Sequence, residues 1–139
     1  MSQRPFKILA IEHVGVAVES IEGLSSIFSD VLGLECIGSE EVIDQQVITD
    51  IYDTGSGKLE FLKATDENSL IRRFIDNKGQ GIHHIALKVD KLQAALDYLK
   101  EQGIQLIDEK PRIGAEGINI SFLHPKSTGG VLIELCEIK

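Results

Sequence analysis

Apolar and polar residues alternate along this chain in a pattern that occurs twice, at a shift of 71 residues. The first copy runs from Ile11 to Val18 and the second from Ile82 to Val89, and each has a histidine at its third position. Alternation with a period of two residues predicts a β-strand. The repeat therefore predicts two similar modules, each beginning with a strand.

Each repeated strand leads into a stretch whose apolar residues recur at helical spacing. In the first copy, Ser20 is the predicted N-cap and Gly33 the stop. In the second copy, Asp90 and Gln93 resemble a capping box, and Gly103 is the stop. The two predicted apolar stripes are Ile21, Leu24, Ile27, Phe28, Val31 and Leu32 in the first helix, and Leu92, Ala95, Leu96 and Leu99 in the second.

The remainder of each copy predicts three further strands. In the first copy they cover residues 34–37, 46–52 and 58–63, with a glycine-containing turn at 54–57. In the second copy they cover 104–107, 118–123 and 131–138, with a turn at 127–130.

Each copy therefore has the order βαβββ, and the predicted fold class is α+β. We expect one domain, residues 1–139, in which module one spans about 7–66 and module two about 80–139. A short helix at 69–78, ending at Gly79, links the modules.

Composition narrows the classes of function. The chain has 139 residues and a formal charge of −8, with 42% hydrophobic and 26% charged residues. An acidic balance argues against nucleic acid as a partner, and no apolar run approaches the roughly 20 residues of a membrane-spanning helix. Cys36 and Cys136 are too few for a disulfide framework, so we expect free thiols and a cytoplasmic location.

Four residues of metal-ligating type occupy equivalent positions in the two copies. His13 matches His84, and Glu60 matches Glu134 after a three-residue loop adjustment. Each glutamate lies between large apolar residues in a predicted strand, where an unpaired carboxylate is costly to bury. By period-two phase, all four side chains lie on one shared inner face, and a divalent metal would offset their charge.

Each of these residues alone has an ordinary structural explanation, such as a hydrogen-bonded strand histidine or a glutamate on a solvated face. Their repetition at matched positions favours the metal. By phase His83 faces the other side, which indicates a structural role. Two nitrogen and two oxygen ligands suit Co, Ni, Mn, Fe(II) or Zn, and open positions on the ion imply Lewis-acid chemistry. No nucleotide-binding glycine loop and no serine-hydrolase motif occurs.

Three segments resemble the vicinal oxygen chelate (glyoxalase) superfamily, and within it the methylmalonyl-CoA epimerase family. They are residues 11–18, residues 79–86 and the stretch FLHPK…GGVLIEL at residues 122–135. The superfamily is built from paired βαβββ modules around a central metal cleft. The resemblance implies His13, Glu60, His84 and Glu134 as ligands of one divalent ion.

The resemblance also implies an activity. A member of this family interconverts the (R) and (S) forms of methylmalonyl-CoA by removing the α-proton and stabilising the enolate with the metal. It further implies Glu134 as a catalytic base, an acyl-CoA thioester as substrate and a homodimer. Lys126 and His124 are candidate substrate-binding residues, because the turn that holds them leads into the strand of Glu134.

One position departs from the family pattern. Some epimerases carry an acid/base glutamate five residues after the Glu of a Glu-Gln-Gly-Val stretch. The corresponding stretch here runs from Asp44 to Thr49, so Thr49 holds that position and becomes a candidate substrate-binding residue. Asp50 is adjacent, but a shift of one residue along a strand reverses the face.

The sequence alone leaves two other functions open. Glyoxalase I shares the ligand set, and a glutamate at position 60, where some epimerases have glutamine, is compatible with it. A non-catalytic ligand-binding or resistance protein of the same fold is the other alternative. The tail motif favours the epimerase over glyoxalase I, and the complete ligand set favours an enzyme over a binding protein.

Overall fold

The computed structural model describes residues 3–138, which divide into two compact units. The first unit comprises residues 13–83, and the second comprises residues 3–12 together with 84–138. The structure has both helices and a mixed sheet, as the predicted α+β class requires. None of the helices among residues 3–138 has the length and apolarity needed to cross a membrane.

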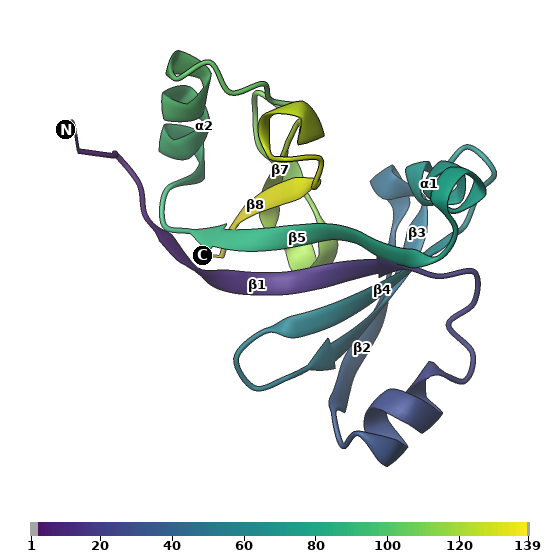
Figure 1. Cartoon of the computed structure of the whole chain (residues 1–139). Coiled ribbons are helices and arrows are strands. Elements are labelled where there is room, and N and C mark those ends of the chain that lie inside the picture. Colours follow the sequence, from purple (N-terminus) through teal and green to yellow (C-terminus); the bar gives the residue numbers. More distant parts are fainter. Residues whose placement is uncertain (1–2, 139) are drawn as a thin grey trace. The chain divides into compact units, whose positions relative to one another are not determined.

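The first unit contains four strands in the order β2-β3-β4-β1 (Figure 1). Strands β2 and β3, and likewise β3 and β4, pair antiparallel, whereas β1 and β4 pair parallel. The turn between β3 and β4 is closed by the Thr54 hydroxyl, which donates to the Gly57 carbonyl over 2.8 Å. The bounds are β1 (Ile8–Ala17), β2 (Glu35–Val42), β3 (Val47–Asp53) and β4 (Lys58–Ala64), with a short 3₁₀ turn η2 (Ile43–Gln45) before β3.

The first predicted helix forms as a short, wide π-helix, η1 (Ser26–Val31), beside β2. Ser20 makes only a local turn, in which its hydroxyl accepts from the Glu22 amide at 3.2 Å. Because the π-helix bonds residue i to residue i+5, the 3.6-residue stripe does not stay on one face. Part of that stripe, including Phe28, packs on the sheet, whereas Val31 is 78% exposed. The prediction of a regular amphipathic helix here was wrong.

The short helix between the modules is confirmed as α1 (Leu70–Lys78). Ser69 caps it, since its hydroxyl accepts from the Ile71 amide at 3.1 Å. The helix ends at Gly79, whose φ of 79° lies in the left-handed region that favours glycine.

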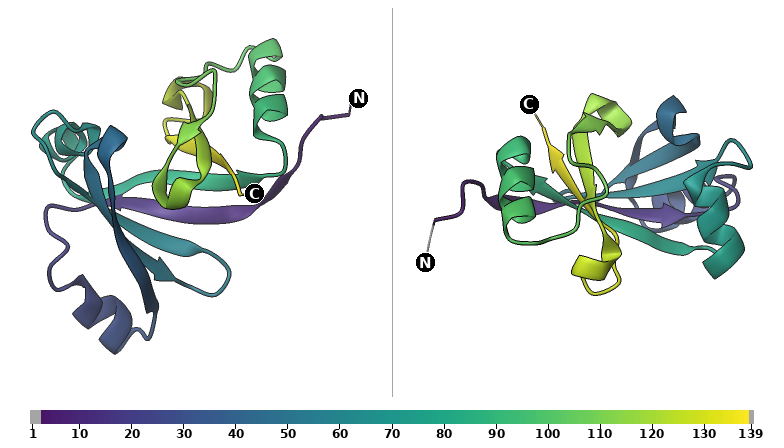
Figure 2. Two further views of the ribbon diagram at one scale, coloured as in Figure 1. Left: turned by 180° about the vertical axis from the view of Figure 1, so that it is seen from behind. Right: turned by 90° about the horizontal axis from the view of Figure 1, so that it is seen from above.

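The second unit contains strands in the order β5-β8-β7-β6. Its helix α2 (Leu92–Glu101) packs beside β8 (Figures 1 and 2). The helix buries Leu92, Ala95 and Leu96. Strand β5 pairs parallel with β8, and β8 with β7 and β7 with β6 pair antiparallel. The bounds are β5 (Gly81–Val89), β6 (Arg112–Ile113), β7 (Asn119–Leu123) and β8 (Ile133–Glu137), with 3₁₀ turns η3 (Ala115–Gly117) and η4 (Pro125–Ser127).

Two local predictions for this unit were wrong. Residues 104–107 form no strand beyond a single bridge from Leu106 to Leu123, and the short strand after α2 is β6 instead. The capping box is also absent, because the Asp90 carboxylate accepts from the Lys7 amide at 2.7 Å. The first amide of α2 is bound by a distant side chain, Glu137, at 2.7 Å. Neither long-range contact has a local signature in the sequence.

The N-terminal segment belongs to the second unit although it precedes the first. Phe6 packs in the cluster that contains Val89 and Leu96, and its ring meets that of Tyr98 edge-on at a centroid distance of 5.9 Å. The Lys7 carbonyl also accepts from the Asp90 amide at 3.2 Å. The boundary between the units therefore falls inside β1 and inside β5, at residues 12/13 and 83/84.

Candidate metal and active site

The first unit contains a buried histidine–carboxylate pair. His13 comes from β1 and Glu60 from the neighbouring β4, and His13 Nδ1 lies 3.0 Å from Glu60 Oε2. Their exposed fractions are 6% and 4%. Gly15, which shares the face of His13, is the register partner of Glu60, so the neighbouring position on β1 places no side chain beside Glu60.

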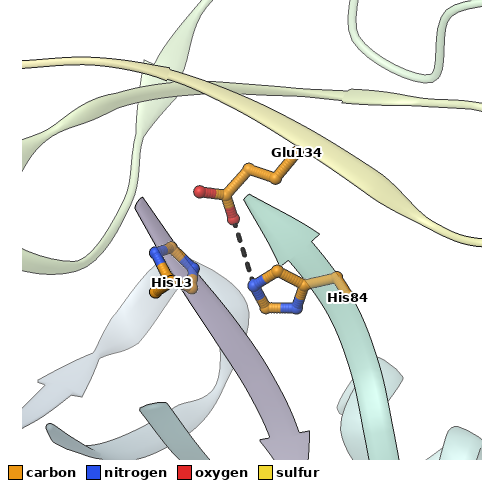
Figure 3. Close-up of side chains that lie close together, drawn as sticks. All are labelled: His13, His84 and Glu134. Atoms are coloured by element: carbon orange, nitrogen blue, oxygen red, sulfur yellow. Dashed lines mark ion pairs between the residues drawn. The ribbon is translucent and has the colours of Figure 1, made fainter. Parts of the chain in front are cut away.

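The second unit contains an equivalent pair. His84 comes from β5 and Glu134 from β8, and His84 Nε2 lies 3.3 Å from Glu134 Oε1 (Figure 3). Both side chains are buried. A small residue again lies across from the glutamate, because Ala86 is the register partner of Glu134. Phe122 pairs with Glu134 on β7, and its ring meets the His84 ring edge-on at 5.7 Å.

The chemistry of these donors fits a divalent cation. Imidazole nitrogen and carboxylate oxygen are ligands for borderline divalent ions such as Zn, Co, Ni and Mn. A buried carboxylate is costly without a compensating positive charge or hydrogen bonds. Each unit therefore supplies one nitrogen donor and one oxygen donor that are already drawn together and shielded from water.

Glu12 is a buried acidic residue that reasoning from the sequence missed. It is 8% exposed, and it directly precedes His13 on β1. Strict alternation places Glu12 on the face opposite His13, so the period-two pattern gave no reason to select it. The available signal was an acidic residue directly after four consecutive apolar residues, Ile8 to Ile11.

Thr49 lies on the same face of the first unit as Glu60. In the β3–β4 register, Ile51 pairs with Glu60 and Thr49 with Leu62, and residues two apart share a face. Thr49 is completely buried, and its Oγ1 has no hydrogen-bond partner in the structure. Leaving a buried polar group without a partner costs about 1–3 kcal/mol.

Asp50 does not take the place of Thr49, because it faces the other side. It pairs with Phe61 and shares a face with Tyr52, which packs with Phe61 in the cluster under η1. Burial raises the pKa of the Tyr52 hydroxyl, and the nearby Cys36 and Asp50 raise it further. The predicted reversal of face between Thr49 and Asp50 is confirmed.

His124 and Lys126 lie together at the start of η4. His124 Nδ1 accepts a hydrogen bond from the Lys126 amide at 3.1 Å, so its imidazole caps this turn. The Lys126 side chain is exposed. This bond leaves His124 Nε2 and the Lys126 ammonium as the groups able to donate to a ligand.

His83, beside His84 in the sequence, packs as a structural residue. Its ring meets Phe74 edge-on at a centroid distance of 5.0 Å. Burial, with a smaller contribution from Lys78, lowers the pKa of His83 to about 4. The ring is therefore neutral at physiological pH.

Comparison with known proteins places this geometry in a family. Residues 12–122 match the model of the Glyoxalase/Bleomycin resistance protein/Dioxygenase superfamily. The mitochondrial methylmalonyl-CoA epimerase of Mus musculus is 37% identical over 131 residues, which cover 94% of this chain and 74% of that protein. The chain belongs to the methylmalonyl-CoA epimerase family of this superfamily.

Solved structures of the family agree with the fold. The epimerase of Mycobacterium tuberculosis matches with a TM-score of 0.90 at 33% identity, covering 95% of this chain and 89% of that one. A methylmalonyl-CoA epimerase solved with methylmalonyl-CoA and NH4+ matches with a TM-score of 0.88 at 28% identity, covering 94% and 95%. The predicted glyoxalase-like fold and the resemblance to this epimerase family are confirmed.

Proposed function

We propose that this chain is an epimerase that interconverts the (R) and (S) forms of methylmalonyl-CoA. Membership of the epimerase family supports the activity. The observation that carries the mechanism is the pair of buried histidine–glutamate contacts at repeat-equivalent positions, one in each unit.

His13, Glu60, His84 and Glu134 are proposed to hold one divalent metal ion, with Co, Ni, Mn and Zn as the candidates. The support is the chemistry of the donors, their burial and their equivalence in the repeat. Such an ion, when bound, would supply positive charge where negative charge develops on the thioester oxygen as the α-proton leaves.

Glu134 is the proposed base that removes the α-proton. Its carboxylate is buried, and the contact with His84 limits its orientation, so it is positioned before substrate binds. A carboxylate in reach of the α-carbon accepts the proton on one face, and return of a proton to the other face inverts the centre. The surrounding apolar residues exclude water, which strengthens electrostatic interactions at the reacting carbon.

Lys126 and His124 are proposed to bind the acyl-CoA. Their free donor groups suit the carboxylate of the substrate or the phosphates of CoA. A homodimer is proposed as well, supported by exposed apolar residues on β1 (Ile8, Leu9 and Ile11) and on η1 (Ile27 and Val31). The proposed location is the cytoplasm, supported by two cysteines, neither of which is in a disulfide.

The decisive experiment follows exchange of the α-proton of methylmalonyl-CoA with solvent deuterium, using protein loaded with each metal in turn. We expect exchange with the wild-type protein and its loss in Glu134→Gln, by about 10²–10⁴-fold as for removal of a general base. Retained exchange in the metal-loaded variant would refute the role of Glu134.

Glu137→Gln is the matched control. Glu137 lies on the same strand but on the opposite face, and glutamine keeps the oxygen that binds the Leu92 amide. Full activity is therefore expected. Parallel assay of a glutathione hemithioacetal separates the epimerase from glyoxalase I, and turnover of that compound alone would refute the epimerase assignment.

A further inference from the structure

The hydroxyl of Thr49 is a buried hydrogen-bonding group that has no partner within the fold, at a position that the sequence indicates as a candidate for substrate binding. The residue is 0% exposed, and Oγ1 has no partner in the structure. Buried hydroxyls in folded proteins are nearly always hydrogen-bonded. Asp50 Oδ1 also has no partner, but it faces the other side of the sheet, whereas Thr49 Oγ1 lies on the face that carries Glu60. This position beside Glu60 indicates a ligand as the missing partner of the Thr49 hydroxyl.

The repeat shows that the fold does not need a hydroxyl at this position. Glu60 pairs with Ile51, and Glu134 pairs with Phe122, so these two positions are equivalent. Two residues earlier along each strand, Thr49 corresponds to Ile120. Ile120 is 3% exposed and packs in an apolar cluster with Ala86, Phe122 and Cys136.

The same strand position thus accepts a wholly apolar side chain in one unit and carries an unpaired hydroxyl in the other. Valine has the shape of threonine without the hydroxyl, and it would fill the position in β3 without leaving a polar atom unpaired. Because the apolar alternative serves packing at least as well, we look to substrate binding for the use of the hydroxyl.

We propose that Thr49 Oγ1 donates a hydrogen bond to an oxygen of the acyl group of the bound thioester. This role rests on the proposed epimerase function. The position suits it, because Thr49 lies diagonally across the β3–β4 pair from Glu60, roughly 7–8 Å away as such neighbours are. At this distance from Glu60, the uncharged Thr49 hydroxyl can orient the acyl group without hydrogen-bonding to the Glu60 carboxylate.

The test compares Thr49→Val with Thr49→Ser in the steady-state epimerase assay and in thermal unfolding. We expect Thr49→Val to lower kcat/KM by about tenfold, which is the loss of about 1.4 kcal/mol of transition-state binding. Its Tm without substrate should be equal to or above that of the wild type, because no internal hydrogen bond is lost. Thr49→Ser keeps the hydroxyl and should retain kcat/KM within about threefold.

Two matched controls lie in the other unit. Ser121 is equally buried, but its hydroxyl donates to the Lys110 carbonyl at 3.3 Å, and its strand phase places it on the opposite face from Glu134. Ser121→Ala should therefore lower Tm and leave kcat/KM unchanged. Ile120→Thr places a hydroxyl in the apolar cluster and should lower Tm. The size of this decrease measures how much stability an unpaired buried hydroxyl costs at this strand position.

Two results would overturn the proposal. If Thr49→Val lowers Tm as Ser121→Ala does and leaves kcat/KM unchanged, the hydroxyl serves the fold through a bound water. If Thr49→Val loses activity and Thr49→Ser does not restore it, the hydroxyl is not the cause. A wild-type protein that exchanges no α-proton would instead refute the epimerase function itself, and this role with it.

Discussion

Each unit carries a histidine–glutamate pair on two parallel strands, β1 and β4 in the first unit and β5 and β8 in the second. The helices that cover the strands differ between the two units. The second unit packs a regular helix, α2, that buries Leu92 and Leu96 in an aliphatic cluster. The first unit has a short π-helix with no fully buried residue. It lies over an aromatic cluster in which the ring centroids of Phe28 and Phe61 are 4.7 Å apart. The two units therefore share the strand pairing that positions the histidine and the glutamate, whereas the helices packed on those strands differ.

The largest expected difference between the two donor pairs appears when the glutamate of each pair is replaced in a separate variant. Glu60→Gln and Glu134→Gln should both lower the metal content of the purified protein, because both remove a charged ligand. Exchange of the α-proton should fall far more in Glu134→Gln, by about 10²–10⁴-fold, because only that change also removes the proposed base. Metal analysis and deuterium exchange on the same samples measure both effects, and equal losses of exchange would contradict the division of roles.

The next largest effect concerns the two cores. Phe61→Ala should destabilise by about 3–5 kcal/mol and Leu96→Ala by about 2–5 kcal/mol, since each leaves a cavity in a different unit. Urea unfolding gives the free energies, and amide hydrogen exchange resolved by residue shows where protection is lost. If the units unfold together, either change lowers protection in both. Loss of protection confined to the altered unit would show that each unit unfolds by itself.

Metal binding should stabilise the protein through both units. Addition of Co or Ni to chelator-treated protein should raise Tm, with about 3 kcal/mol gained at a free metal concentration 100 times the dissociation constant. The double variant His13→Gln with His84→Gln should show no rise. A rise that survives in the double variant would place the binding site elsewhere.

The smallest effect compares the caps of the two α-helices. Ser69→Ala removes a local cap from α1, and Glu137→Ala removes the distant side chain that binds the first free amide of α2. Each should cost about 0.5–2 kcal/mol in thermal or urea unfolding. Because Glu137 also ties α2 to the end of β8, its loss should reduce amide protection in both elements, whereas loss of the Ser69 hydroxyl should affect α1 alone.

Local patterns were enough to predict most of the fold. Alternation located β1, β3, β4, β5, β7 and β8 to within a few residues, and the combination of Ser69 with Gly79 located α1. The π-helix was not predictable from a 3.6-residue stripe, because its wider turn arises from how the segment sits on the sheet. The remote capping of α2 by Glu137 was equally hidden, since 45 residues separate the two partners.

The candidate site divides in the same way. Period and repeat selected His13, Glu60, His84 and Glu134 as one set of candidates. In the structure His13 contacts Glu60, and His84 contacts Glu134. The sequence pattern did not select Glu12, because strict alternation places Glu12 and His13 on opposite faces of the strand. The unpaired state of the Thr49 hydroxyl is a property of three-dimensional packing, and only the structure could reveal it.

The placement of residues 3–12 has a consequence for dividing the chain. A cut at the repeat boundary near Gly79 would separate Phe6 from Val89, Leu96 and the rest of its cluster, and Lys7 from Asp90. Neither fragment would hold all the residues of one unit. The sequence repeats are therefore not independent folding units: the second unit is assembled from both ends of the chain, and the covalent connection through residues 13–83 keeps its two parts at high effective concentration.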